Sequence, residues 1–145
     1  MIRSITRSQA ILYVASATLL GSLTGVPAAQ AAGPGCSINT LHGQFGFYRS
    51  GNTPDGPLAA VGSISFDGRG NAYGTQSISR NGAYSFDLDF INLYEVKTNC
   101  SGRLLFSDGT EFARLVVING GKGFYIFSES LGNAIYGVGT RIDTE

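Results

Sequence analysis

The single histidine, His42, is the residue on which most side-chain chemistry in this chain would depend. A Ser-His-Asp or Cys-His arrangement uses a histidine as its base, and no serine stands in the G-x-S-x-G pattern of a nucleophile elbow. A zinc site takes three or four protein ligands. This chain offers one histidine and two cysteines that are prone to form a disulfide, which is not enough. We therefore interpret His42 as a solvated or capping residue and predict no catalytic residue, metal site or cofactor.

Carboxylates offer two further candidate sites, a catalytic pair and a calcium loop. Asp87 and Asp89 alternate along one strand face, roughly 7 Å apart at Cα. Glycosidase carboxylates instead face each other across a cleft, so a solvated face explains this pair. The string D-G-R-G-N at residues 67–71 resembles a calcium loop, but Arg69 stands where an oxygen ligand is needed. The sequence favours a protein that is not an enzyme and leaves that question open.

Cys36 and Cys100 are the only cysteines. If the amino terminus directs export, as argued below, an even pair in a small domain predicts a disulfide bond, since metal or redox pairs use C-x-x-C spacing and histidines.

Aromatic residues are the remaining signal for binding. Tyrosines inside a small barrel would pack an apolar ligand and direct their hydroxyls to its polar end, whereas the alternative is ordinary cross-strand packing. The candidate ligand-binding residues are Tyr48, Tyr73, Tyr84, Tyr125 and Tyr136.

The amino terminus reads as a secretory signal. Arg3 and Arg7 precede an apolar run at residues 10–23, and Ala29-Gln30-Ala31 forms an A-x-A cleavage site. A lipoprotein is the alternative because Cys36 lies close by, but Gly33 stands where a Leu-like residue is needed. We predict a signal peptide at 1–31, cleaved after Ala31, and one domain at 32–145 that is secreted or periplasmic.

Composition excludes some partners. Removal of Arg3 and Arg7 leaves eight basic residues against ten acidic ones, a net charge of −2. This mild, interspersed balance gives no basic patch for nucleic acid or anionic lipid.

The elements that would position these residues are short strands joined by tight turns. The stretch 60–75 reads as strand, Asp-Gly turn, strand, and Asn81-Gly82 marks a second hairpin. In the following strand, alternation predicts that Tyr84, Phe86, Leu88 and Phe90 share one face. The stretch 51–57, G-N-T-P-D-G-P, reads as a polar loop where a mouth or lid would lie, or as a plain connection.

Two later strands, Phe112–Ile118 and Phe124–Phe127, are apolar on both faces. Such runs predict cover on both sides, by a packed sheet or another subunit. We therefore consider a homo-oligomer formed through these strands.

Sequential hairpins predict an all-β, antiparallel up-and-down meander closing into a small eight- or nine-stranded barrel, with no substantial helix. An outer-membrane barrel would use strands of about 9–11 residues, and those expected here are shorter. We expect no membrane span.

The order G-x-F-G-F-Y, A-A-V-G-S-I-S-F-D-G-R-G-N, Cys-Ser-Gly, S-D-G-T and V-V-I-N-G-G-K resembles a group of small exported bacterial proteins of unsettled function. The resemblance implies a barrel similar to allene oxide cyclase and dirigent proteins, or more loosely to lipocalins. It implies no catalytic residue.

Three hypotheses follow. The first is a secreted or periplasmic, non-catalytic barrel that binds a small apolar ligand in its lumen or mouth. The second is a structural protein that self-associates. The third, an isomerase of the allene oxide cyclase kind, rests on fold analogy.

Overall fold

The computed structural model describes residues 35–143, and the predicted signal peptide lies outside this range. Eight strands make up most of it, with two short 3-10 turns, η1 (Ile38–Thr40) and η2 (Asn119–Gly121). The strands are β1 (His42–Thr53), β2 (Gly56–Asp67), β3 (Asn71–Arg80), β4 (Ala83–Val96), β5 (Ser101–Phe106), β6 (Glu111–Ile118), β7 (Gly123–Ser128) and β8 (Ala134–Arg141).

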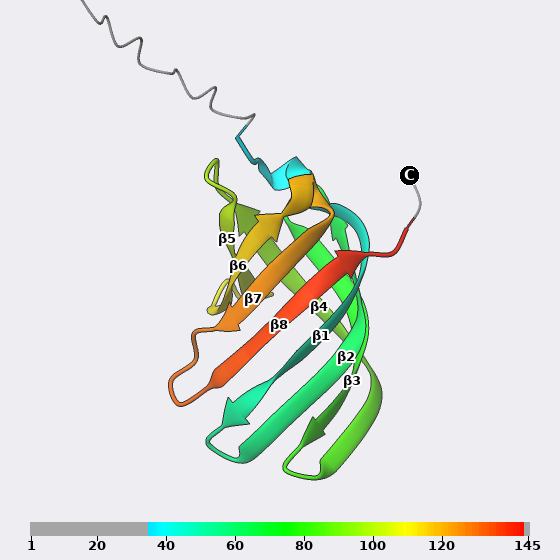
Figure 1. Cartoon of the computed structure of the whole chain (residues 1–145), viewed down its shortest axis with the longest axis vertical. Coiled ribbons are helices and arrows are strands. Elements are labelled where there is room, and N and C mark those ends of the chain that lie inside the picture. Colours follow the sequence, from blue (N-terminus) through cyan, green and yellow to red (C-terminus); the bar gives the residue numbers. More distant parts are fainter. Residues whose placement is uncertain (1–34, 144–145) are drawn as a thin grey trace, which may run out of the picture. The chain divides into compact units, whose positions relative to one another are not determined.

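Each strand pairs antiparallel with the next, and β1 pairs with β8 to close the barrel (Figure 1). The all-β meander predicted from the sequence is confirmed, with eight strands. Closure pairs the two outermost strands, whereas residues 83–91 of β4 pair with β3 alone, because β5 pairs only with residues 92–96. In the part of the chain that the structure describes, no helix is long and apolar enough to cross a membrane.

The β2–β3 hairpin turns at Asp67, as predicted. One Asp67 carboxylate oxygen accepts the backbone N–H groups of Arg69, at 2.7 Å, and Asn71, at 2.9 Å. The other accepts the Asn71 side-chain amide at 2.6 Å. These bonds lower the pKa of Asp67 to about 2. The D-G-R-G-N string is thus a turn held together by its own aspartate.

The first half of the barrel has longer strands than expected. The strands β1–β4 each run 10–14 residues, so the prediction of short strands is wrong for this half. The polar loop predicted at 51–57 is also mostly strand, with only Pro54 and Asp55 outside β1 and β2. Pro57 is tolerated because it lies near the strand end, where its carbonyl accepts the Asn81 amide.

A β-bulge in β4 corrects a second expectation. The β3–β4 register shifts between Gln76 and Ile78, and Asp87 adopts a φ of 51°. The extra residue reverses the alternation of faces. Tyr84 and Phe86 are therefore exposed on the outside, whereas Phe90 lines the lumen, so these residues do not share one face.

Aromatic rings fill one end of the barrel. Phe45, Phe66 and Phe124 meet with ring centroids 5.4–5.5 Å apart, and the Tyr94 ring lies 4.9 Å from Phe66. All four are almost wholly buried. Edge-on contacts of this kind stabilise beyond their buried area, so this end is a packed core.

The segment before β1 covers the same end, drawn at the top of Figure 1. The predicted disulfide between Cys36 and Cys100 is confirmed, with the two Cα atoms 4.9 Å apart. The Tyr94 hydroxyl donates to the Leu41 carbonyl at 2.8 Å and lies 3.2 Å from the Ile38 carbonyl. The disulfide, the Tyr94 hydroxyl and the Cys36 N–H, which donates to the Thr98 carbonyl at 3.0 Å, therefore hold this cover in place.

Candidate functional site

The other half of the lumen is open and forms a cavity of about 390 Å³. A cavity of this size accommodates one small molecule. Phe124 belongs both to the packed core and to the cavity wall, so the core forms the cavity floor. The apolar lining residues are Phe47, Leu58, Ile64, Phe90, Leu104, Phe106, Phe112, Phe124, Ile126 and Ile135.

Turns at the lower end of Figure 1 form the mouth of this cavity. Pro54 and Asp55 contribute from the β1–β2 turn, and Ser130 and Asn133 from the β7–β8 loop. The β1–β2 turn therefore lies at the mouth, although it is much shorter than the predicted loop.

An aromatic pair lies among the lining residues because of a second bulge. The β5–β6 register shifts between Leu104 and Leu105, which leaves Phe112 unpaired on β6. The Phe112 ring stacks on Phe106 with centroids 4.5 Å apart. The bulge thus gives the cavity a flat, apolar wall.

Arg49 brings a positive charge into this apolar space. Its Nη2 donates to the Gln76 Oε1 at 2.9 Å, and both residues line the cavity. The Nε atom is buried and has no hydrogen-bond partner. Burial, and then the nearby charge of Arg80, lower the pKa of Arg49. Arg49 is therefore a poorly compensated cation inside the barrel.

Glycines on β8 make room for these side chains. Gly137 pairs with Arg49 across the sheet, and a Cβ there would lie 2.7 Å from the Arg49 Cβ. A Cβ on Gly139 would lie 2.2 Å from the Phe124 ring. The depth and shape of the lumen thus depend on the absence of side chains at these two positions.

The five candidate tyrosines do not line the cavity. Each is more than half exposed, on the outer wall of the barrel. The residue that the ligand hypothesis missed is Arg49, although the sequence carried its signal: strand alternation places Arg49 on the face of Phe45 and Phe47. Tyr48, between them, points the other way.

The other candidates for chemistry lie apart from the cavity. His42 Nδ1 lies 2.8 Å from the Asn39 carbonyl at the covered end of the barrel. Asp87 and Asp89 are exposed and are not among the lining residues. Within residues 35–143, no three His, Cys, Asp or Glu side chains gather as a metal site would need.

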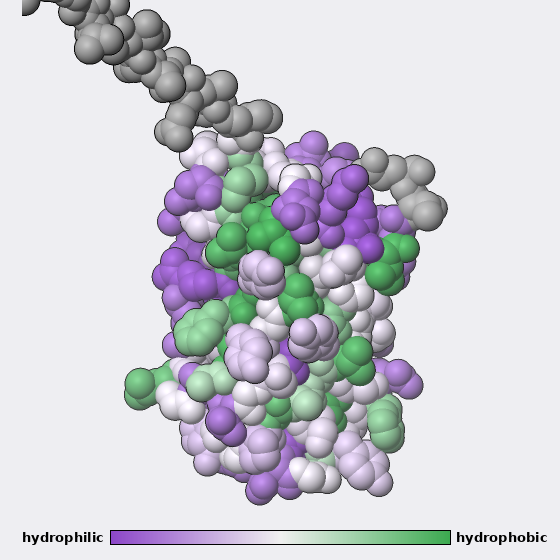
Figure 2. Space-filling view, in the orientation of Figure 1, coloured by the Kyte–Doolittle hydropathy of each residue, from purple (hydrophilic) through white to green (hydrophobic). Residues whose placement is uncertain are grey.

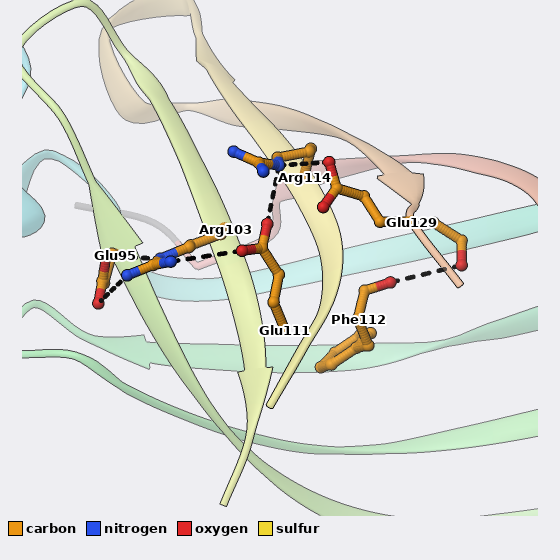
Figure 3. Close-up of polar contacts among 7 residues, drawn as sticks. Glu95, Arg103, Glu111, Phe112, Arg114 and Glu129 are labelled. Atoms are coloured by element: carbon orange, nitrogen blue, oxygen red, sulfur yellow. Dashed lines mark hydrogen bonds and ion pairs between the residues drawn. The ribbon is translucent and has the colours of Figure 1, made fainter. Parts of the chain in front are cut away.

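Charged residues are concentrated on one side of the barrel. Arg103 on β5 pairs with Glu95 on β4 at 2.7 Å and with Glu111 on β6 at 3.3 Å. Arg114 then joins Glu111 to Glu129, which continues the chain of ion pairs (Figure 3). The hydrogen bonds from the arginines lower the pKa of Glu95 and of Glu129.

The opposite wall is uncharged. From β7 through β8, β1, β2 and β3, charged side chains occur only at strand ends, apart from the inward Arg49. One cross-strand row begins at Val116 on the neighbouring β6 and crosses this wall through Tyr125, Val138, Tyr48 and Val61. In Figure 2, this side is mostly pale or green, and strongly hydrophilic side chains gather mainly at its upper end and left edge. We call this surface the uncharged wall.

Comparison of the chain with protein-family models, curated proteins and solved structures gives no match. The chemistry of the site must therefore be argued from its own residues.

Proposed function

We propose that this protein is an exported, non-catalytic barrel that binds a small, largely apolar molecule in the open half of its lumen. The observation that carries the proposal is the cavity of about 390 Å³ above a packed aromatic floor. Binding pockets for small molecules are mostly apolar, with a few placed polar groups, and this lining has that composition.

The polar groups support binding better than catalysis. Arg49, Gln76 and Asn92 line the cavity, and neither a guanidinium nor an amide accepts a proton at neutral pH. The carboxylate of Asp55 lies at the mouth. An isomerase similar to allene oxide cyclase remains the weaker proposal, because it would need a positioned acid or base near its substrate.

Export is part of the same proposal. The disulfide supports an oxidising compartment, where such bonds persist. The residues of the predicted signal peptide lie outside the described range.

The test is titration with a neutral fluorescent probe, N-phenyl-1-naphthylamine. We expect saturable binding with one site per chain. The variant Asn92→Phe places a ring in the cavity and should abolish binding, whereas Thr75→Phe adds the same ring to the outer wall and should not. Absence of a saturable signal, together with an empty organic extract of the purified protein, would overturn the proposal.

Self-association is a second candidate function, favoured by the uncharged wall. The strands at Phe112–Ile118 and Phe124–Phe127 direct one face into the core, but Val116, Tyr125 and Phe127 on the other face are about half exposed. Exposed apolar patches of this kind commonly mark interaction surfaces. Sedimentation would detect the assembly, and a monomer at tens of micromolar would count against it.

A further inference from the structure

We propose that the ligand of the lumen is an apolar monocarboxylate and that Arg49 holds its acid group. This inference rests on the proposed function and specifies the chemical class of the ligand. It starts from a mismatch between the charge inside the barrel and the groups available to compensate it.

Among the described residues, Arg49 has few hydrogen-bond acceptors and no ion pair for an arginine that points into a barrel. A guanidinium carries five N–H donors, and within residues 35–143 that of Arg49 makes one hydrogen bond, to Gln76 Oε1. Its Nε has no acceptor although water does not reach it. Among residues 35–143, no carboxylate lies within ion-pair distance of Arg49. Arg49 is half-buried, and charges held partly out of water are ordinarily paired, so an anionic ligand group would suit this position.

Neighbouring charges do not compensate the positive charge of Arg49. Arg80 also lines the cavity, and its charge disfavours the cationic form of Arg49. Asp55, at the mouth, forms no ion pair with either arginine. A ligand carboxylate would supply the missing charge and accept two N–H bonds from the planar guanidinium.

The other lining residues indicate the chemical character of the rest of the ligand. Phe47 stands two residues before Arg49 on β1 and lines the same cavity, as do Phe90 and the stacked pair Phe106 and Phe112. These rings suit an aromatic or alkyl body. A phosphate, with two charges and more oxygen atoms, would leave acceptors facing phenyl rings and is disfavoured.

The experiment compares two ligands of nearly equal shape, 2-naphthoate and 2-naphthamide, by isothermal titration calorimetry on the disulfide-bonded protein. We expect the acid to bind at least about tenfold more tightly than the amide, as a charge-assisted bond provides. The variant Arg49→Met should remove this preference and leave the affinity for the amide within about threefold. Arg69→Gln, at the exposed β2–β3 turn, is the matched control and should preserve the preference.

The ratio measured on the unaltered protein keeps the test decisive even where Arg49→Met folds poorly. Equal binding of acid and amide would overturn the carboxylate assignment and leave the proposed function standing. A preference that survives in Arg49→Met would overturn the role of Arg49. Binding of neither compound, with no saturable uptake of the neutral probe, would overturn the proposed function itself.

Discussion

Tyr94 and Arg49 both place polar atoms inside the barrel, but only Tyr94 has its donor satisfied. The Tyr94 hydroxyl finds the carbonyl of Leu41 in the covering segment, and burial raises its pKa. Arg49 finds only one neutral amide. The first residue is therefore suited to stability and the second to recognition, although both lie on the inner face of a strand.

Replacing Tyr94 by Phe should destabilise the protein by about 1 kcal/mol, the net worth of one buried hydrogen bond. The loss leaves the Leu41 carbonyl without its donor. Urea unfolding measures the change. Tyr73→Phe, at an exposed hydroxyl on the outer wall, is the control and should have little effect. Equal stability of the two variants would mean that the Tyr94 bond contributes nothing.

Asp67 should contribute to the loss of folding stability at acidic pH. Its pKa in the folded protein is about 2, below the usual value of 3.8, so its contribution is complete above pH 4 and is lost as the pH falls towards 2. An NMR titration should place the Asp67 pKa near 2. In Asp67→Asn, unfolding free energy should fall less steeply with pH across this window, and an unchanged slope would contradict the assignment.

At the residue scale, the sequence predicted the disulfide and the turn at Asp67 because compartment, cysteine count and turn chemistry act locally. It misplaced the tyrosines because the pattern of a strand defines two faces without saying which one is inside. Arg49 was overlooked because a charge among aromatics reads as surface. Only closure of the barrel shows that Phe45, Phe47 and Arg49 share the interior.

Among the elements, the segment before β1 is the one that a disulfide bond joins to the barrel. The disulfide joins residues 64 positions apart, and the chain-entropy estimate for a loop of that size gives about 4 kcal/mol. The double variant Cys36→Ser/Cys100→Ser should lose stability of this order in urea unfolding. Addition of a reductant should destabilise the unaltered protein but not the variant. A variant as stable as the oxidised protein would show that the covering segment holds without its bond.

The strand β8 should tolerate no side chain at Gly139. The Cβ of Gly139→Ala would lie 2.2 Å from the Phe124 ring, which is confined by Phe45 and Phe66. Overpacking of this kind costs about 1–3 kcal/mol. Gly46→Ala is the control, because its Cβ meets only the Ile142 side chain at 3.3 Å. Calorimetric melting of both variants measures the difference in stability between them. Equal melting temperatures would show that the Phe124 ring moves aside freely.

Strand order and turn positions were predictable because Gly and Asn-Gly signals punctuate the chain locally. The two bulges were not. Nothing in the sequence marks Asp87 or Phe112 as the extra residue of a bulge. Each nevertheless reverses the face of every residue that follows it in its strand. The length of β1 and β2 was underestimated since Pro57 and the glycines suggested a loop, whereas pairing along the closed barrel carries both strands to the mouth.

At the level of the whole molecule, the ion-paired side and the uncharged wall differ in how readily another surface could bury them. If the protein self-associates through the uncharged wall, Tyr125→Lys should shift sedimentation at tens of micromolar towards the monomer, because a lysine buried in an interface loses hydration. Asp89→Lys, on the exposed face of β4, is the control and should leave the assembly intact. Equal behaviour of the two variants would exclude this wall as the contact surface.

The covered end of the barrel has a kinetic consequence. Because the disulfide and Tyr94 hold that end shut, a molecule in the lumen would enter and leave at the open end, where the turns at Pro54 and Ser130 lie. Substitutions at these turns should then speed or slow capture and escape by similar factors and leave the dissociation constant nearly unchanged. The residence time of the ligand would be set by hairpins that scarcely contribute to its affinity.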